Sequence, residues 1–284
     1  MIAPEKHEIL HRMSQVKDLP PLPLSLQRLL EIVRSQVTTA GELESIILYD
    51  QSLASRILRV ANSAYYGNRG KVTTVSRAIS LMGFDQAKSI CLLALLIEMF
   101  ENRPELSVSE RENLWKHAFC TARLAGIMAA RRPWATREEA NLFGLLHDLG
   151  KLVMVLYFHD YYREIQHMAE QRGLPFWCME LQFGLTHTQL GKWVAVKWSF
   201  PQVFQDVMEF HHTPWKSTSH RAEVKLITLA DTLAHSAGRS DAALDRMVAH
   251  CCRDLLIGPD EWSEYQSVVR EVWVEVEQLW GLLS

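Results

Sequence analysis

Asn141-Leu-Phe-Gly-Leu-Leu-His-Asp-Leu-Gly-Lys151 is the most informative stretch of this sequence. It lies inside a nearly continuous apolar run, residues 140–158, whose ionisable side chains His147, Asp148 and Lys151 cluster near the middle. An aspartate and a lysine at the centre of an apolar run argue strongly against a membrane span. We therefore interpret the run as a helix buried in the core of a soluble protein.

A buried Asp148 needs a strong partner. Removing a carboxylate from water costs several kcal/mol even after relaxation. Lys151, three residues further along an exposed helix, would return only ~0.2–0.5 kcal/mol. A divalent metal shared with His147 would hold the carboxylate more firmly. A single histidine beside a structural ion pair is the open alternative, since such pairs also occur in cores.

The composition is that of an ordinary globular chain. Of 284 residues, 48% are hydrophobic and 22% charged, and the net charge of −3 gives no global attraction to nucleic acid or anionic membranes. The five cysteines are odd in number and show no CxxC spacing, which indicates reduced thiols. The N-terminus lacks the apolar core of a signal peptide, so a cytoplasmic location is expected.

The pattern of apolar residues predicts an all-α protein. Apolar residues recur at helical spacing almost throughout, without a convincing run of alternating strands. Capping boxes are expected at Thr39–Glu42, Ser107–Glu110 and Thr136–Glu139. The expected helices cover about 25–34, 39–48, 52–62, 75–82, 85–100, a long helix from 107 ended by Pro133, the helix from 136 that carries the opening stretch, 161–171, 177–183, 186–198, 201–210, 222–235, 242–253 and 262–282.

The charged, proline-containing stretch 101–111 is the best candidate boundary, and it predicts an N-terminal helical lobe (1–104) and a second helical lobe with a C-terminal helix (105–284). The helix pair around Gly83 superficially resembles a helix-turn-helix. Its second helix carries one basic residue among apolar ones, so we interpret the pair as core packing and expect no DNA binding. The C-terminal helix carries an apolar stripe, Tyr265, Val269, Val272, Val276 and Leu279, and should pack on the body or on a partner.

Polar residues that can bind metal recur along the second lobe, each among apolar neighbours. Nitrogen and oxygen ligands of this kind fit one or two divalent ions, which lower the pKa of a bound water. Lys151, one turn beyond His147, could then bind a phosphate oxygen. The candidate ligands are His117, His147, Asp148, His187, His211, His212 and Asp231.

The other histidines are interpreted as ordinary hydrogen-bonded residues, because a lone histidine on an apolar helix is more often structural than a ligand. They are His7, His11, His159, His167, His220, His235 and His250.

The order His … His-Asp … Asp, with Leu-Gly-Lys after His-Asp, resembles the HD superfamily of metal-dependent phosphohydrolases. Other segments resemble the HDOD domain, an HD-related output domain of bacterial signalling proteins. The most distinctive is Asp50-Gln-Ser-Leu-Ala-Ser-Arg-Ile-Leu-Arg-Val-Ala-Asn-Ser-Ala-Tyr-Tyr-Gly67. Leu19-Pro-Pro-Leu-Pro23, Ala78-Ile-Ser-Leu-Met-Gly83, Leu114-Trp-Lys-His117 and His187-Thr-Gln-Leu-Gly191 extend the resemblance to roughly residues 15–235.

The resemblance implies an N-terminal helical lobe packed on an HD-like lobe. It implies that His117, His147, Asp148 and Asp231 hold one metal. By likeness to the branch that cleaves cyclic dinucleotides, Asp148 would bridge to a second ion held by His187, His211 and His212. Iron, manganese, zinc, nickel or magnesium are the ions expected.

Two departures argue against cyclic-dinucleotide hydrolysis. No Gly-Tyr-Pro follows the paired histidines, and Asn113 stands where that branch can carry an acidic ligand. HDOD domains generally act as regulatory modules. We therefore expect a signalling output module that works with a partner protein, an upstream sensor or receiver domain, or a nucleotide ligand, and that can form a homodimer. The alternative is a phosphohydrolase acting on a nucleotide or cyclic dinucleotide, with Asp148 and Lys151 as its catalytic residues.

Overall fold

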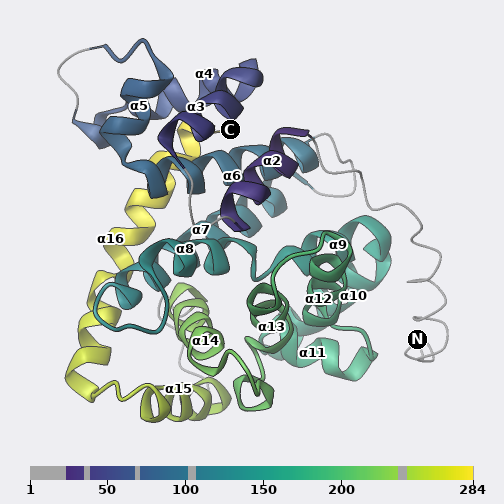
Figure 1. Ribbon diagram of the computed structural model, residues 1–284. Helices are drawn as coiled ribbons and strands as arrows, with labels where there is room; N and C mark the ends of the chain where they lie inside the picture. Colours follow the sequence, from purple (N-terminus) through teal and green to yellow (C-terminus); the bar gives the residue numbers. More distant parts are fainter. Residues whose placement is uncertain (1–23, 35–38, 68–70, 102–106, 236–241, 284) are drawn as a thin grey trace.

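The computed structural model describes residues 24–34, 39–67, 71–101, 107–235 and 242–283, and these form an all-α fold without strands (Figure 1). The helices are α2 (Leu24–Arg34), α3 (Ala40–Tyr49), α4 (Gln51–Ala61), η1 (Ala64–Tyr66), α5 (Val75–Met82), α6 (Phe84–Glu101), α7 (Val108–Ala129), α8 (Arg137–Leu146), α9 (Leu149–Tyr157), α10 (His159–Arg172), α11 (Phe176–Phe183), α12 (His187–Lys197), α13 (Gln202–Phe210), η2 (Pro214–Lys216), α14 (Arg221–His235), α15 (Ala242–Asp254) and α16 (Pro259–Leu283).

Local sequence signals set where several helices begin and end. The predicted capping boxes at Thr39–Glu42, Ser107–Glu110 and Thr136–Glu139 all form, each joining the N-cap side chain to the N3 backbone and the N3 side chain to the N-cap backbone. Gly173 and Gly184 adopt left-handed conformations directly after α10 and α11 and so end those helices.

The N-terminal group of helices, α2 to α6, shares a core with the rest of the chain. Gly83 has a φ of 84° and turns the chain between α5 and α6. The middle of α6 is buried on nearly all sides, from Ile90 to Ile97. Even its one lysine, Lys88, is buried and pairs with Glu138 of α8. The interpretation of this helix pair as core packing is confirmed.

Glycines allow the helices of the second group, α7 to α15, to approach one another closely. A Cβ atom on Gly144 of α8 would lie 2.5 Å from the Cα atom of Ala122 in α7. A Cβ atom on Gly150, the glycine of the His-Asp-Leu-Gly-Lys motif, would lie 1.9 Å from the carbonyl oxygen of His187 in α12. Gly150 therefore brings the start of α9 against the start of α12.

The C-terminal helix α16 packs on both groups of helices, touching α7 and α14 as well as α4 and η1 (Figure 1). Its predicted apolar stripe is buried: Tyr265, Val269, Val272, Val276 and Leu279. Polar contacts accompany this packing. The Tyr65 hydroxyl of η1 donates to Glu275 Oε1 at 2.7 Å, and Arg123 Nε of α7 lies 2.6 Å from the same oxygen. The helix thus links the Tyr-Tyr-Gly segment to the second group.

Some expectations fall outside the described residues. These include the HDOD-like segment 19–23, while the helix expected from about residue 25 begins at Leu24. The boundary at 104/105 also falls there, so the division into two lobes stays a prediction. Among the described residues, no single helix is both long and apolar enough to cross a membrane, and two bent helix pairs meet that test only in combination. The described cysteines are all free thiols.

Candidate metal centre

The predicted ligands come from five places in the second group of helices and meet at one buried point. Helix α7 supplies one, the α8–α9 junction two, the first residue of α12 one, the end of α13 two, and α14 one. Each side chain is buried. They are His117, His147, Asp148, His187, His211, His212 and Asp231.

The expectation of one continuous helix through the opening stretch is wrong. Helix α8 ends at Leu146 and α9 begins at Leu149, with His147 and Asp148 between them. Neighbouring residues of an unbroken α-helix point about 100° apart. The interruption instead turns both side chains to the same point, with His147 Nε2 3.4 Å from Asp148 Oδ2.

One cluster gathers on the Oδ2 side of Asp148. His117 Nε2 lies 3.6 Å from Asp148 Oδ2 and 3.0 Å from Asp231 Oδ1. His147 Nε2 lies 3.5 Å from the same oxygen of Asp231. We call His117, His147, Asp148 and Asp231 the first cluster.

A second cluster gathers on the Oδ1 side of the same carboxylate. His187 Nε2 and His211 Nε2 lie 3.2 Å and 3.7 Å from Asp148 Oδ1, and 3.2 Å from each other. His212 completes a group whose ligand atoms lie within 4.8 Å of one another. We call Asp148, His187, His211 and His212 the second cluster. Asp148 thus stands between two potential cation positions.

The Nδ1 contacts of His147 and His211 show which ring nitrogen of each residue faces the centre with a lone pair. His147 Nδ1 lies 2.7 Å from the carbonyl oxygen of Gly144, and His211 Nδ1 lies 3.0 Å from that of Val207. A carbonyl oxygen can only accept, so each Nδ1 carries the proton. In the neutral ring, Nε2 then presents a lone pair to the centre.

Buried polar atoms at the centre lack hydrogen-bond partners within the described part of the chain. They are His117 Nε2, His147 Nε2, Asp148 Oδ1 and His212 Nδ1. Unsatisfied buried polar atoms are rare in native proteins and call for an explanation. Lone pairs that face carboxylate oxygens repel them unless a cation lies between. The donor set, imidazole nitrogen with carboxylate oxygen, therefore fits a divalent metal ion.

The pKa shifts describe a centre of ionised carboxylates. Burial alone would raise the pKa of Asp148, but His147 and Lys151 hold it well below its usual range. Burial would also raise the pKa of Asp231, but His235 and His117 hold that pKa well below its usual range. Both acids are thus ready to bind a cation.

His187 and His211, the two histidines of the second cluster that face Asp148, differ in the direction of their pKa shifts. Burial alone would lower the pKa of His187, but Glu180 and Asp148 raise it to about 9. Burial, with His147 and His187 nearby, lowers the pKa of His211 to about 3. The surrounding charges therefore favour a proton on His187 and disfavour one on His211.

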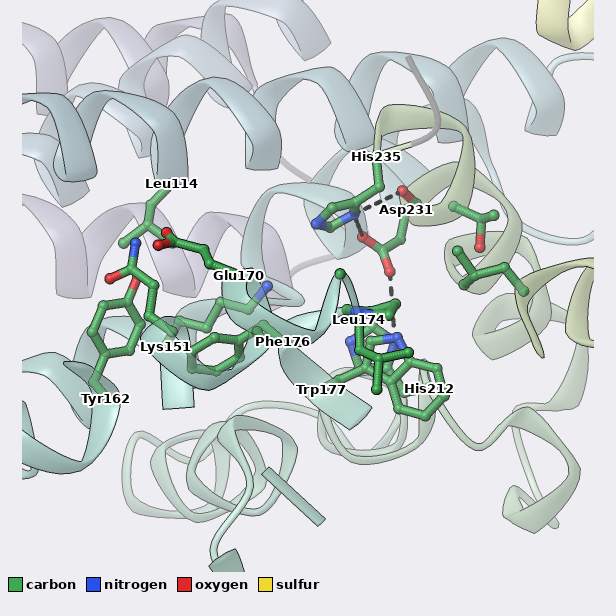
Figure 2. A pocket seen from close by; sticks show the side chains of 16 residues that line it. Leu114, Lys151, Tyr162, Glu170, Leu174, Phe176, Trp177, His212, Asp231 and His235 are labelled. Atoms are coloured by element: carbon green, nitrogen blue, oxygen red, sulfur yellow. Dashed lines mark hydrogen bonds and ion pairs between the residues drawn. The ribbon is translucent and has the colours of Figure 1, made fainter. Parts of the chain in front are cut away.

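A pocket of about 710 Å³ adjoins the centre. Lys151, His212 and Asp231 are among the residues that line it (Figure 2). Its lining also contains apolar and aromatic side chains, among them Leu114, Tyr162, Leu174, Phe176 and Trp177. The ring of Trp177 stacks on His212, with centroids 5.1 Å apart and planes inclined by 15°. The pocket thus joins an aromatic wall to the charged centre.

Sequence reasoning missed two neighbours of the centre. His235, interpreted as an ordinary hydrogen-bonded residue, contacts Asp231 Oδ1 through Nδ1 at 2.9 Å and lines the pocket. Glu180 is fully buried and bonds to His187. The signal for Glu180 was present, since it is the one acid in the apolar helix Phe-Trp-Cys-Met-Glu-Leu-Gln-Phe.

The remaining histidines do not enter the clusters. Among the described ones, His220 pairs with Asp206 and His250 with Asp254. His159 and His167 also lie outside the clusters. His7 and His11 lie outside the described residues.

Solved structures share this fold. An HDOD domain protein of unknown function from Geobacter sulfurreducens aligns with a TM-score of 0.80 at 22% identity, covering 96% of each chain. A candidate signal transduction protein from Marinobacter aquaeolei aligns at 0.78 and 21%, covering 99% of this chain and 67% of that one. A candidate phosphohydrolase from Shewanella amazonensis aligns at 0.76 and 19%, covering 96% and 98%.

Sequence comparison places the chain in a family. An uncharacterised protein of Treponema pallidum is 22% identical over 200 residues, which are 70% of this chain but only 38% of that protein's length. The family model of the HDOD domain matches residues 19–214, most of the chain and most of the ligand set. The chain belongs to the HDOD domain family.

Proposed function

We propose that this protein is a bacterial signalling output module whose HD-type centre binds one or two divalent metal ions. The observation that carries the proposal is the convergence of buried, unpartnered atoms on Asp148: its own Oδ1, His147 Nε2, His117 Nε2 and, further out, His212 Nδ1. A metal ion would satisfy these atoms together. A structural relic would gain nothing from keeping such an arrangement, because each unsatisfied buried group costs about 1–3 kcal/mol.

The pocket supports a ligand that carries phosphate and a flat ring, such as a nucleotide. Lys151 and the metal centre supply positive charge for a phosphate oxygen, and Trp177 and Phe176 offer ring faces to a base. A bound divalent ion would supply Lewis acidity toward that phosphate. Lys151 and His212 would orient the ligand at the centre, and the aromatic wall would exclude water from it.

The N-terminal helices support a role that goes beyond ligand binding. A minimal HD hydrolase would not need the lobe formed by α2–α6. On α3 of that lobe, Leu48 and Tyr49 are 61% and 60% exposed, which suits contact with a partner protein, an upstream receiver or sensor domain, or a second copy of this chain. We propose that occupancy of the centre regulates such an interaction.

The alternative function is a metal-dependent phosphohydrolase. The position of Asp148 between two clusters favours it, because two-metal sites share ligands in this way to act on phosphoesters. Relatives described as candidate phosphohydrolases are consistent with it. In that case Asp148 and Lys151 would be the catalytic residues. Asn113, which stands where the two-metal branch can carry an acidic ligand, weighs against the two-metal reaction.

The first test measures metal content. Protein purified without oxygen or chelator is compared with Asp148→Ala by elemental analysis, with circular dichroism as the check on folding. We expect near-stoichiometric iron, manganese, zinc or a similar metal in the wild type and its loss in the variant. No metal in either protein, even after addition of divalent ions, would refute the proposal.

A second test separates the two functions. The metal-loaded protein is screened against mononucleotides and cyclic dinucleotides for release of phosphate or opening of the ring. We expect binding without turnover. Turnover that Asp148→Ala abolishes would instead establish the phosphohydrolase.

A further inference from the structure

Glu180 of α11 holds one histidine of the second cluster by two bonds. Its Oε1 accepts from the backbone N–H of His187 at 2.6 Å, and its Oε2 accepts from His187 Nδ1 at 2.6 Å. Both side chains are fully buried. Both carboxylate oxygens therefore bind a single residue, one through its backbone and the other through its ring.

These two hydrogen bonds depend on the tight connection between α11 and α12. Gly184 ends α11 in a left-handed conformation, and Thr186 caps α12 through a capping box with Gln189. His187 is the first residue of α12, so its N–H has no partner within that helix. Glu180 satisfies this N–H, and the positive end of the α12 dipole favours the carboxylate there.

The same contact decides which ring nitrogen of His187 faces the metal centre. A carboxylate can only accept, so Nδ1 must carry a proton. In the neutral ring, Nε2 is then the lone-pair atom, and it lies 3.2 Å from Asp148 Oδ1 and from His211 Nε2. Histidine ligands commonly have their tautomer fixed by such a carboxylate.

We propose that Glu180 is the positioning residue of the second cation position: it fixes the ring and the tautomer of His187 so that Nε2 binds the ion. This inference rests on the proposed metal binding. A residue that only capped α12 would not determine which ring nitrogen of His187 carries the proton.

Glu180→Gln separates positioning from capping. The glutamine oxygen can still accept from the His187 backbone N–H, so the cap survives. Its NH₂ group then faces Nδ1, which must become the acceptor, and the proton of the neutral ring moves to Nε2. The variant thus keeps the fold and removes the lone pair from the centre. Asp206→Asn is the matched control, because Asp206 Oδ2 accepts from His220 Nδ1 at 2.7 Å outside the clusters.

Zn²⁺ titration of metal-free protein by calorimetry gives the first readout. We expect two ions in the wild type and in Asp206→Asn. In Glu180→Gln we expect one ion of unchanged affinity at the first cluster and a second bound about 10–100-fold more weakly. Glu180→Gln that binds both ions like the wild type overturns the inference, and so does a wild type that binds one ion. A wild type that binds no ion refutes the proposed function itself.

Nitrogen-15 NMR of histidine-labelled, metal-free protein gives the second readout, with His187→Asn to assign the signals. We expect His187 Nδ1 to be protonated in the wild type and unprotonated in Glu180→Gln. An unprotonated Nδ1 in the wild type would overturn the inference whatever the metal content. A role confined to capping predicts no change between the two proteins in either readout.

Discussion

Lys151 Nζ donates to Asp148 Oδ2 at 2.5 Å, so the lysine of the motif bonds to the carboxylate that stands between the two clusters. Both side chains are buried, and burial of the lysine is balanced by Asp148, which raises the pKa of Lys151. In the metal-free protein Lys151 therefore supplies positive charge where a metal ion would otherwise supply it.

Lys151→Met should destabilise the metal-free protein much more than the metal-loaded one. Removing one partner of a buried ion pair costs about 3–5 kcal/mol, because the other charge is left uncompensated. A bound divalent ion would compensate Asp148 and reduce that cost. Urea unfolding with chelator and with Mn²⁺ measures both values. The double variant Asp148→Asn/Lys151→Met is the control and should recover part of the loss; equal destabilisation with and without Mn²⁺ would contradict the prediction.

Much of the fold followed from local sequence signals. The capping boxes placed the starts of α3, α7 and α8, and the apolar stripe of α16 is buried as its spacing indicated. Such signals depend on residues a few positions apart, which is why they can be read without a structure.

Features set by contacts between distant segments could not be predicted in the same way. The break between Leu146 and Leu149 lies in an apolar run whose pattern predicts one continuous helix, and it is followed directly by the close approach of Gly150 to His187 in α12. His235 lies at the centre only because α14 packs against α7. The composition of the cluster was predictable, whereas its geometry depended on tertiary packing.

Gly150→Ala should destabilise the protein and disturb the second cluster. The added Cβ atom would meet the His187 carbonyl oxygen at 1.9 Å and the Gly191 nitrogen at 2.6 Å, so α9 and α12 must move apart. Overpacking of this kind typically costs about 1–3 kcal/mol. Thermal unfolding and Zn²⁺ titration measure the two effects. Gly281→Ala in α16, where a Cβ atom meets nothing within 4 Å, should be neutral or stabilising.

The stability of the metal-free protein should depend on the ionisation of His187. Glu180 and Asp148 raise its folded pKa to about 9, above the unfolded value of about 6.5. The stability gained from this proton is therefore fully present below pH 6.5 and is lost as the pH rises through 9. Below pH 6.5 this proton adds about 3 kcal/mol to the free energy of unfolding.

Unfolding of the wild type and His187→Asn with chelator, between pH 6 and 10, tests this dependence. The stability difference between the two proteins should shrink as the pH rises. With metal present the trend should reverse, because the ion displaces the same proton and binds more tightly at higher pH. A pH-independent difference between the two proteins would contradict the assignment.

Trp177 should determine affinity for the ring of a ligand without determining metal content. Its ring lines the pocket and stacks on His212, so a base can extend that stack. Stacking of a base on an aromatic side chain contributes about 1–3 kcal/mol. In Trp177→Ala we therefore expect the affinity for AMP to fall roughly 5–150-fold, while inorganic phosphate binds as before. Trp215→Ala is the control, since Trp215 is 56% exposed on η2 outside the pocket lining. Equal loss of AMP and phosphate affinity in Trp177→Ala would mean that the ring supports the centre and does not bind a base.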